Sequence, residues 1–427
     1  MNPQNIKTDK KHKALSISKE QLNKHWVWIL FLTQSIIFVY YWLEWRTLEN
    51  FVLAIDHNKN FLQDFIAHYY PMGKQILQNP TPVSGYFYTS FFALLLIPIS
   101  MQTLPVAMIV WITIQIACLI IFGIVSARGL LKLSPLSLVL YFALLITSFP
   151  LLHNFKWGQV SLLIMACVLS TFLLYKKDKK ILAGILLGIA TSIKLYPAYF
   201  AIYFILRRDI RASISFGLST LMFYFFLPAT TIGFSNWLQF EKATNEAINS
   251  TGWIARDANS QYIAHVGSRW FEIIFNRPAS ESTTQALVVI GYILALSCIA
   301  LVWLLQKNVS TENLTLSLTT LFLIPPFILK TSWPHYFIYL PFCQIATLYY
   351  FSSTNHESST SSKLLYLFPI LSIAFSSIFV FNLFDGWFVY NQYGMLFLAN
   401  LFLFFAILAR TATSFLQTIP KNFNLLN

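Results

Sequence analysis

The 427-residue chain has few charged residues and few cysteines. Charged side chains make up only 11% of the sequence, whereas soluble globular domains carry about 25%. This scarcity excludes an ordinary soluble domain and agrees with a hydrophobic fraction of 56%. The few cysteines all lie inside apolar runs, without metal-ligand spacing, so we interpret them as buried small side chains rather than disulfides or metal ligands. They are Cys118, Cys167, Cys298 and Cys343.

Apolar stretches long enough to cross a bilayer recur from one end of the chain to the other. A membrane helix needs about 17–25 apolar residues. The sequence therefore predicts an all-α polytopic membrane protein with about 11–13 helices, some of them short or interrupted. The candidate spans are about 26–44, 91–126, 134–152, 158–175, 181–206, 211–232, 286–306, 314–330, 336–352, 364–381 and 394–411.

The net charge of +13 is carried by short basic clusters between these runs. Such clusters orient a membrane protein with its basic loops in the cytoplasm, so we interpret them as topology signals and expect no nucleic-acid partner. Residues 1–25 are then a cytoplasmic basic tail, 26–411 one transmembrane domain and 412–427 a C-terminal tail. No cleavage site follows the first apolar run, which we therefore expect to be a membrane helix.

This orientation leaves two long segments outside the cytoplasm, at about 45–90 and 233–285. The cytoplasmic connections are short and carry no motif. We therefore expect the chemistry on the extracytoplasmic face of a bacterial cytoplasmic membrane, with the N-terminus on the cytoplasmic side.

The apolar stretch "GILLGIATSIKLYPAYFAIYFIL" (Gly184–Leu206) contains a single charge, Lys194. A charge at the bilayer centre costs at least about 2.5–3.5 kcal/mol. Pro197 follows three residues later and disfavours helical geometry at Tyr196. Two alternatives remain open: a hairpin of two short helices with Lys194 at its buried tip, or one kinked, tilted helix whose lysine extends to the interface.

The basic clusters "KKDKK" and "RRDIR" flank this stretch. Both are expected in the cytoplasm, so the stretch should make no net crossing. About 26 residues are too few for two full spans, which favours the hairpin.

The first outside segment contains a carboxylate among aromatic residues. Spacings of three and four put Phe61, Asp64, Phe65 and His68 on one helical face. Partial desolvation would raise the pKa of Asp64 and suit it to general-base chemistry. A plain loop carboxylate remains the alternative.

Two later segments carry polar and aromatic groups suited to sugar or phosphate. "RDANSQYIAHVGSRWFEIIFNR" (Arg256–Arg277) includes amide, indole and guanidinium groups, and arginine binds phosphate in a fork. Any interfacial loop would have a similar composition. In "LKTSWPHYF", His335 is either an interfacial belt residue or a group that handles protons or sugar.

These segments together resemble glycosyltransferase family 87, of the GT-C superfamily. "AGILLGIATSIKLYPAYFAIYFILRRDIRA" is similar to the family's "AG…G…K-x-x-P…RR…RA" pattern. "QDFIAHYYPMGKQIL", "YFYTSFFALLLIP", "GQVSLLI", "NSQYIAHVGSR" and "SWPHYF" resemble further family motifs in the family's order. The similarity covers about residues 60–350. Thr89 and Ser90 stand where the family often has prolines, and Ser161 where it often has asparagine.

The resemblance implies a GT-C-type bundle and a reaction at the outer membrane face. A sugar, mannose or another hexose, would pass with inversion from polyprenyl phosphate to an acceptor hydroxyl on a glycolipid or envelope glycan. It further implies catalytic roles for Asp64 and His335 and donor-phosphate binding by Lys194 and Arg269. The residues expected to bind sugar or acceptor are Tyr69, Tyr70, Gln159, Asn259 and Trp333.

Two other functions fit parts of this pattern. A transporter or lipid-linked sugar flippase also has broken helices and intramembrane charges, although no matched pair of interrupted segments is apparent in two repeated halves. A purely structural membrane protein would explain the spans but not the ordered motifs. We expect no cofactor. The resemblance leaves a divalent metal open, since some GT-C enzymes use one, but no acidic or histidine cluster with metal-ligand spacing is apparent in the sequence.

Overall fold

The structure is a computed structural model that describes residues 61–250, 254–255, 257–307, 310–353, 360–384 and 387–418. The basic N-terminal tail, the predicted first span and residues 45–60 of the predicted 45–90 segment lie outside the described residues. The described part is helical and contains no β-strand; one isolated bridge joins Ser148 and Ser377. The predicted all-α class is confirmed.

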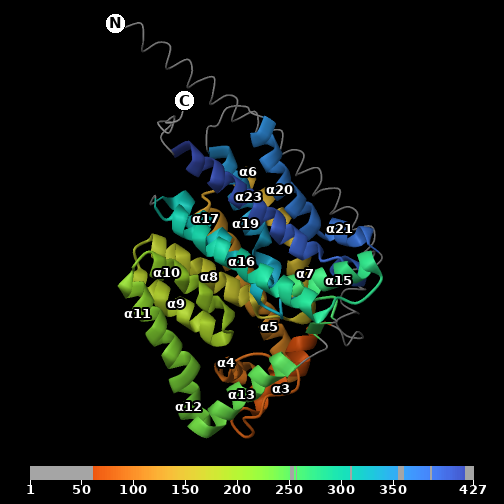
Figure 1. Ribbon diagram of the computed structural model, residues 1–427. Helices are drawn as coiled ribbons and strands as arrows, with labels where there is room; N and C mark the ends of the chain where they lie inside the picture. Colours follow the sequence, from red (N-terminus) through yellow and green to blue (C-terminus); the bar gives the residue numbers. More distant parts are fainter. Residues whose placement is uncertain are drawn as a thin grey trace, which may run out of the picture.

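Most helices are short, and several follow one another with a change of helix type (Figure 1). In chain order they are η1 (Phe65–Tyr69), α3 (Tyr70–Gln75), α4 (Ser90–Ser100), α5 (Leu104–Ile124), η2 (Val125–Leu130), α6 (Pro135–Ile146), α7 (Phe149–Trp157), α8 (Ser161–Lys176), α9 (Lys180–Ile193), η3 (Tyr196–Ala201), α10 (Ile202–Leu206), α11 (Ile210–Thr220), η4 (Leu221–Phe226), α12 (Leu227–Ile232), α13 (Phe234–Ser250), α15 (Ile263–Phe275), α16 (Glu281–Leu305), α17 (Thr311–Phe322), α18 (Pro325–Ile328), η5 (Pro334–Tyr339), α19 (Leu340–Ser353), α20 (Thr360–Ser376), α21 (Ile378–Leu383), α22 (Trp387–Gln392) and α23 (Met395–Thr418).

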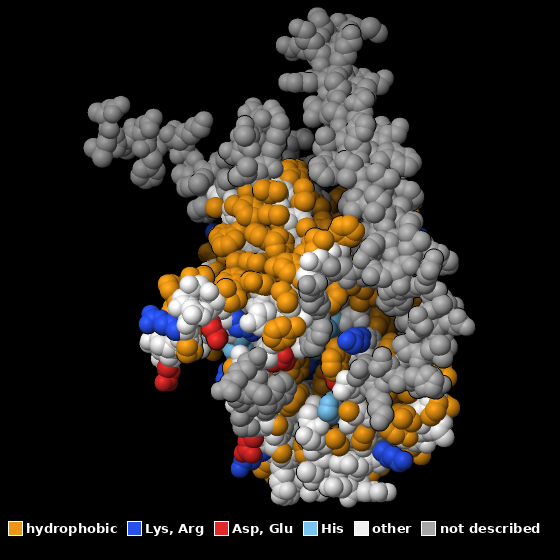
Figure 2. All heavy atoms as spheres, turned by 90° about the vertical axis from the view of Figure 1, so that its right-hand side faces the viewer, with side chains coloured by type: hydrophobic (Ala, Val, Ile, Leu, Met, Phe, Trp, Pro, Cys, Tyr) orange, Lys and Arg blue, Asp and Glu red, His pale blue; other side chains and the backbone are white. Residues whose placement is uncertain are grey.

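Within the described residues, four helical segments are long and apolar enough to cross a membrane. They are Leu104–Leu130, Ile210–Ile232, Glu281–Leu305 and Met395–Ala412. Shorter apolar helices accompany them. Figure 2 shows a continuous hydrophobic area over the upper part of one face, with most of the charged side chains of that face below it. These features support a polytopic membrane protein.

The stretch after Lys180 doubles back on itself. The Lys180 ammonium forms an ion pair of 3.0 Å with Asp209, which follows α10. The Tyr175 hydroxyl donates a hydrogen bond of 3.0 Å to the same carboxylate. The start of α9 and the end of α10 therefore lie together, as the hairpin interpretation requires, and a single kinked span is not what the chain forms.

The break in this hairpin falls at Lys194. The helix α9 ends at Ile193, and Lys194 is extended, with φ −152° and ψ 130°. Pro197 then lies in the first turn of the 3₁₀ helix η3, where its missing N–H costs nothing. The proline thus starts the second half of the hairpin, and the extended residue is Lys194 rather than the predicted Tyr196.

Two glycines let α9 pack closely against α11. A Cβ atom on Gly188 would lie 2.6 Å from the Ser219 side chain, and one on Gly184 would lie 2.5 Å from the Ala212 carbonyl oxygen. Small residues four apart are common where membrane helices approach closely. Close backbone packing against α11 therefore fixes the first arm of the hairpin, in addition to the ion pair at the base of the hairpin.

We expect Gly188→Leu to separate α9 from α11 and to lower stability. Forcing extra methylene groups into a packed interface typically costs about 1–3 kcal/mol. The melting temperature of the purified protein in detergent measures the effect. Gly217→Leu on α11 is the matched control, because a Cβ atom there meets nothing within 4 Å. An equal melting temperature for the two variants would contradict this packing.

Both predicted outside segments contain helices. The first includes η1 and α3, and the second includes α13 and α15. In Figure 1, α3 and α4, in orange and red, lie beside α13, in green. The Glu241 carboxylate on α13 accepts hydrogen bonds of 2.9 Å and 2.6 Å from the backbone N–H and hydroxyl of Ser90, which anchors α13 to the start of α4.

Candidate active site

A cavity of about 330 Å³ opens among these outer segments. Its walls come from η1, the loop before α4, the α7–α8 turn, the loop before α15 and the start of η5. The wall is rich in aromatic and imidazole rings. The lining residues are Asp64, His68, Tyr69, Gly85, Phe87, Tyr88, His153, Trp157, Gln159, Asp257, Asn259, Trp333 and His335.

Asp64 immediately precedes the π-helix η1, and its side chain lines the cavity. The Leu62 N–H donates a hydrogen bond of 2.7 Å to the Lys156 carbonyl, which fixes the chain before the helix. The fully buried Phe65 ring stacks on Trp111 with centroids 5.3 Å apart. The buried Phe65 thus fixes the position of the neighbouring Asp64, whose carboxylate lies in the cavity wall.

Burial raises the pKa of Asp64 to about 6. A hydrogen bond from Gln159 and the positive charge of Lys194 lower the pKa and so limit this rise. The predicted desolvation is therefore present. A carboxylate with such a pKa is ionised at neutral pH and binds a proton more strongly than an exposed aspartate does.

Gln159 stands on a tightly fixed turn between α7 and α8. Gly158 ends α7 with φ +67°, a left-handed conformation that favours glycine. The Trp111 indole donates a hydrogen bond of 2.8 Å to the Gly158 carbonyl, and the Gln115 amide donates one of 2.8 Å to the Gln159 carbonyl. The backbone of Gln159 is therefore held by two buried side chains of α5.

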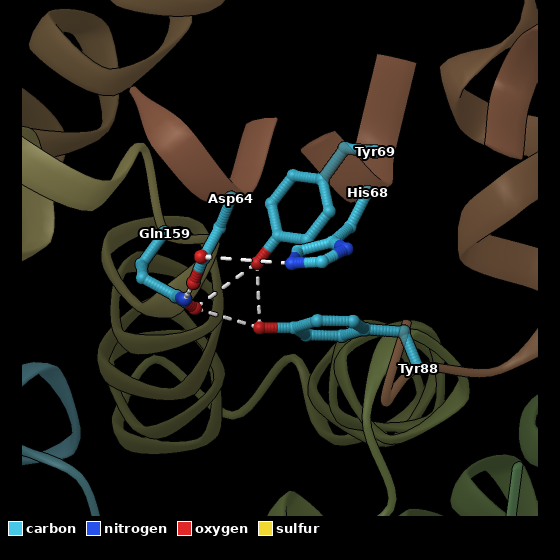
Figure 3. Close-up of polar contacts among 5 residues, drawn as sticks. All are labelled: Asp64, His68, Tyr69, Tyr88 and Gln159. Carbon is cyan, nitrogen blue, oxygen red and sulfur yellow. Dashed lines mark hydrogen bonds and ion pairs between the residues drawn. The ribbon is translucent and has the colours of Figure 1, made fainter. Parts of the chain in front are cut away.

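Two tyrosines determine which way the Gln159 amide faces (Figure 3). The Tyr88 hydroxyl donates to Gln159 Oε1 at 2.7 Å, and the Tyr69 hydroxyl lies 2.6 Å from the Tyr88 hydroxyl and 3.0 Å from Oε1. Since Oε1 accepts from tyrosine, Nε2 faces Asp64 and donates a hydrogen bond to Oδ2. The network thus directs the Gln159 amide N–H at the Asp64 carboxylate. The other carboxylate oxygen of Asp64, Oδ1, lies 4.0 Å from His68 Nε2.

We expect Gln159→Leu to shift the acidic limb of the pH–rate profile upward. The amide hydrogen bond lowers the pKa of Asp64, so its loss raises that pKa and a higher pH is needed to ionise the carboxylate. The measurement is kcat/KM against pH for both proteins, since this ratio reports the free enzyme. A limb that stays in place would show that Gln159 does not control the ionisation of Asp64.

Lys194 lies beside the cavity between two aromatic rings. Its ammonium is 4.3 Å from the centroid of the Tyr88 ring and 4.5 Å from that of Tyr336. These cation–π contacts stabilise the charge without neutralising it. Among the described carboxylates none forms an ion pair with it, although its Coulombic effect reaches Asp64. The positive charge therefore remains available to an anionic ligand.

The family-like segment before α4 also contributes to this arrangement. The Thr89 hydroxyl donates to the Ser192 carbonyl at the end of α9 and accepts from the Phe92 N–H at the start of α4. It thereby ties the break at Lys194 to the cavity wall. This contact gives a structural role to one residue that departs from the family's proline pattern.

Most of the predicted site residues meet at the cavity. Those that line it are Asp64, Tyr69, Gln159, Asn259, Trp333 and His335. Tyr70 does not: its hydroxyl donates a hydrogen bond of 2.9 Å to the carbonyl of Gln102, between α4 and α5. The tyrosine pair in the sequence points in two directions, so a binding role for Tyr70 gains no support from this geometry.

Arg269 lies outside the lining as well. Its guanidinium donates to the backbone carbonyls of Ser260, Gln392 and Asp257 at 2.8, 3.1 and 3.3 Å, and to that of Asn391 at 3.4 Å. These bonds use four of the five N–H donors of the guanidinium. The predicted phosphate-binding role therefore gains no support from this geometry, in which Arg269 holds the loop that presents Asn259 to the cavity.

Several lining residues were not among the predicted ones. They are His68, Gly85, Phe87, Tyr88, His153, Trp157 and Asp257. The spacing of His153 and Trp157, one helical turn apart, was a signal that could have found both. Within the described residues no group of three or more His, Cys, Asp or Glu side chains could hold a metal ion.

Comparison with known proteins adds sequence relationships. A polyprenol-phosphate-mannose-dependent alpha-(1-2)-phosphatidylinositol mannoside mannosyltransferase of Mycobacterium tuberculosis is 26% identical over 194 residues, 45% of this chain and 42% of that protein. The protein of the same description from Mycolicibacterium smegmatis is 39% identical over 61 residues, 14% of this chain and 13% of that protein. A pentamannoside mannosyltransferase of Mycobacterium tuberculosis is 26% identical over 162 residues, 34% of this chain and 37% of that protein.

The alignments span less than half the length of these curated relatives. No solved structure matches the chain. The model of glycosyltransferase family 87 matches residues 86–332, more than half of the sequence. Asp64, Trp333 and His335 fall outside that match, so their roles rest on the geometry of the cavity. By the extent of the match, the chain belongs to glycosyltransferase family 87.

Proposed function

We propose that this protein is a membrane glycosyltransferase that moves a hexose from a polyprenyl-phosphate donor to an acceptor hydroxyl. The observation that carries the proposal is the pairing of Asp64, a buried carboxylate on the cavity wall, with the unneutralised ammonium of Lys194 beside it. Family membership and the names of the relatives, which specify polyprenol-phosphate-mannose dependence, support the donor class.

In the proposed reaction Asp64 acts as general base. The acceptor hydroxyl gives its proton to the Asp64 carboxylate while its oxygen forms a bond to the anomeric carbon. The bond from that carbon to the phosphate oxygen breaks, and the electron pair leaves with polyprenyl phosphate. A single displacement inverts the anomeric configuration, and its transition state resembles an oxocarbenium ion.

Lys194 would stabilise the leaving phosphate as negative charge develops on it. A fixed cation in a site with little water is worth more than one in bulk solvent. The rings of Tyr88 and Tyr336 hold the ammonium in place, so little reorganisation is needed when the charge appears. His335, on the cavity wall next to Tyr336, would contact the donor.

The location of the ends of the hairpin supports an extracytoplasmic site. Lys180 and Arg207, in basic clusters of the type that remain in the cytoplasm, lie at the base of the hairpin, whereas Lys194 lies at its tip. The acceptor would then be a glycolipid or envelope glycan at the outer face of a bacterial cytoplasmic membrane. The relatives named for phosphatidylinositol mannosides support a lipid-linked glycan as acceptor.

Transfer in detergent separates this proposal from transport. Purified protein is incubated with radiolabelled polyprenyl-phosphate mannose and glycolipid acceptors, and the products are identified by mass spectrometry. A transferase moves the label without a sealed compartment, whereas a flippase or transporter needs one. Movement of the label across vesicles without any transfer in detergent, tested over a panel of hexosyl donors, would favour the transporter alternative.

A further inference from the structure

Two histidines of the cavity wall have no hydrogen-bond partner for their ring nitrogens among the described residues. His153 on α7 is 8% exposed and His335 on η5 is 2% exposed. Their rings stack with centroids 5.6 Å apart and an interplanar angle of 27°. Within the described residues all four ring nitrogens lack a hydrogen-bond partner. Buried polar atoms are nearly always paired, so unpaired ones that line a cavity point to a ligand.

Each histidine lies beside a tryptophan that also lines the cavity. The His153 and Trp157 rings are 5.9 Å apart, and the Trp333 and His335 rings are also 5.9 Å apart. We call these four residues the His–Trp wall. It combines two flat apolar surfaces with a central strip of unpaired polar atoms.

The surroundings of both imidazoles favour the neutral form. Burial lowers the pKa of His153 to about 3, with a further contribution from Lys156. Burial also lowers the pKa of His335 well below its usual value, and the positive charge of Lys194 acts in the same direction. A neutral imidazole has one N–H donor and one bare nitrogen acceptor. The pair therefore offers two donors and two acceptors.

This combination distinguishes hydroxyl groups from phosphate. An ionised phosphate only accepts hydrogen bonds, so it would leave both imidazole acceptors unpaired and buried. A sugar hydroxyl both donates and accepts, so neighbouring hydroxyls can pair all four nitrogens. The apolar faces of Trp157 and Trp333 suit the C–H surface of a sugar ring.

The wall lies next to a ring that holds the cation. His335 is 5.2 Å from the Tyr336 ring, and that ring holds the Lys194 ammonium at 4.5 Å. A sugar on the wall would thus lie next to the place expected for the donor phosphate. From this adjacency we infer that the His–Trp wall binds hydroxyl groups of the transferred sugar, and that His153 is a substrate-binding residue. The inference rests on the proposed function, since it assumes a polyprenyl-phosphate donor.

The test compares binding of polyprenyl phosphate with and without a hexosyl group. Dissociation constants are measured by native mass spectrometry of the full chain in detergent, over a panel of hexosyl donors. For at least one hexose the unmodified protein should bind the glycosylated lipid roughly tenfold more tightly than the bare lipid, an effect of the size of one or two hydrogen bonds.

His153→Phe keeps an aromatic ring on the wall but removes both nitrogens. We expect it to abolish the sugar-dependent gain, to bind bare polyprenyl phosphate as the unmodified protein does, and to melt at no lower temperature. Retention of the gain in this variant, or absence of any gain in the unmodified protein, would overturn the inference. Failure of the unmodified protein to bind either lipid would instead overturn the proposed function.

Discussion

Asp64→Asn is expected to lower sugar transfer by about 10²–10⁴-fold, the range that general-base catalysis contributes. The amide keeps the shape of the side chain and its place beside Gln159, but it cannot take the acceptor's proton. Donor binding should persist because the phosphate is expected at Lys194 rather than at Asp64. The measurement is the initial rate of transfer from labelled donor in detergent, together with donor affinity.

The same substitution should not destabilise the fold. The pKa of Asp64 is raised in the folded protein, from 3.8 to about 6. The folded state therefore binds the proton more strongly than the unfolded state, and stability is lost as pH rises through this interval. Asparagine removes this cost, so the variant should be more stable than the unmodified protein at neutral pH, by up to about 3 kcal/mol.

A matched control for this variant lies far from the cavity. Asp178 stands in the turn before α9 with φ +59°, a conformation that asparagine also tolerates, and its side chain is 87% exposed. Asp178→Asn should transfer sugar at the normal rate. Full activity of the Asp64 variant would exclude Asp64 as the base and would direct attention to Asp257 on the cavity wall or to Asp56, which lies outside the described residues.

Lys194→Ala is expected to reduce turnover by about 10²–10³-fold, as the loss of a fixed group that stabilises developing charge does elsewhere. The ammonium also lowers the pKa of Asp64. Its removal should therefore move the acidic limb of the pH–rate profile upward as well. These two readouts, a lower rate and a shifted limb, would not accompany a merely structural change.

Expression and melting temperature should change little in this variant, because the charge makes no ion pair with a described carboxylate. Lys242→Ala is the matched control, since Lys242 is an exposed lysine of α13 whose ion pair within the described part of the chain is with Glu246, at 3.8 Å. Normal turnover in the Lys194 variant would remove the proposed role of the ammonium.

The sequence carried enough information for the class of the fold and for a break in the helix between Lys194 and Pro197. A lone charge followed by Pro197 in an apolar run is compatible with few membrane structures. The basic clusters on both flanks excluded a net crossing of the membrane. The exact position of the break was less predictable. Pro197 is compatible with the first turn of a helix, so it did not determine which of the preceding residues became extended.

The site was predictable where a motif fixed the direction of a side chain and not elsewhere. Asp64, Gln159 and Trp333 all line the cavity. Tyr69 and Tyr70 are adjacent, and on a helix adjacent side chains point about 100° apart, so only one could reach the cavity. The guanidinium of Arg269 is of a type that binds phosphate. However, it donates hydrogen bonds to backbone carbonyls from loops that are far apart in the sequence, which local patterns do not predict.

His153 illustrates what sequence reasoning misses. Its importance follows from the stacking on His335, 182 positions away along the numbering. Neither histidine has a local pattern that predicts the other as its neighbour. Contacts of this kind depend on how α7 and η5 pack, and packing between distant elements is not encoded in local periodicity.

The central claim is that one cavity brings a carboxylate and an ammonium to a polyprenyl-phosphate sugar. Electron cryo-microscopy of the Asp64→Asn protein with bound polyprenyl-phosphate mannose tests it most directly. We predict that the phosphate contacts Lys194 and that the anomeric carbon faces residue 64. A lipid phosphate bound instead at the other end of the hairpin, in the basic pocket beside Lys176 and Arg207, would contradict the account.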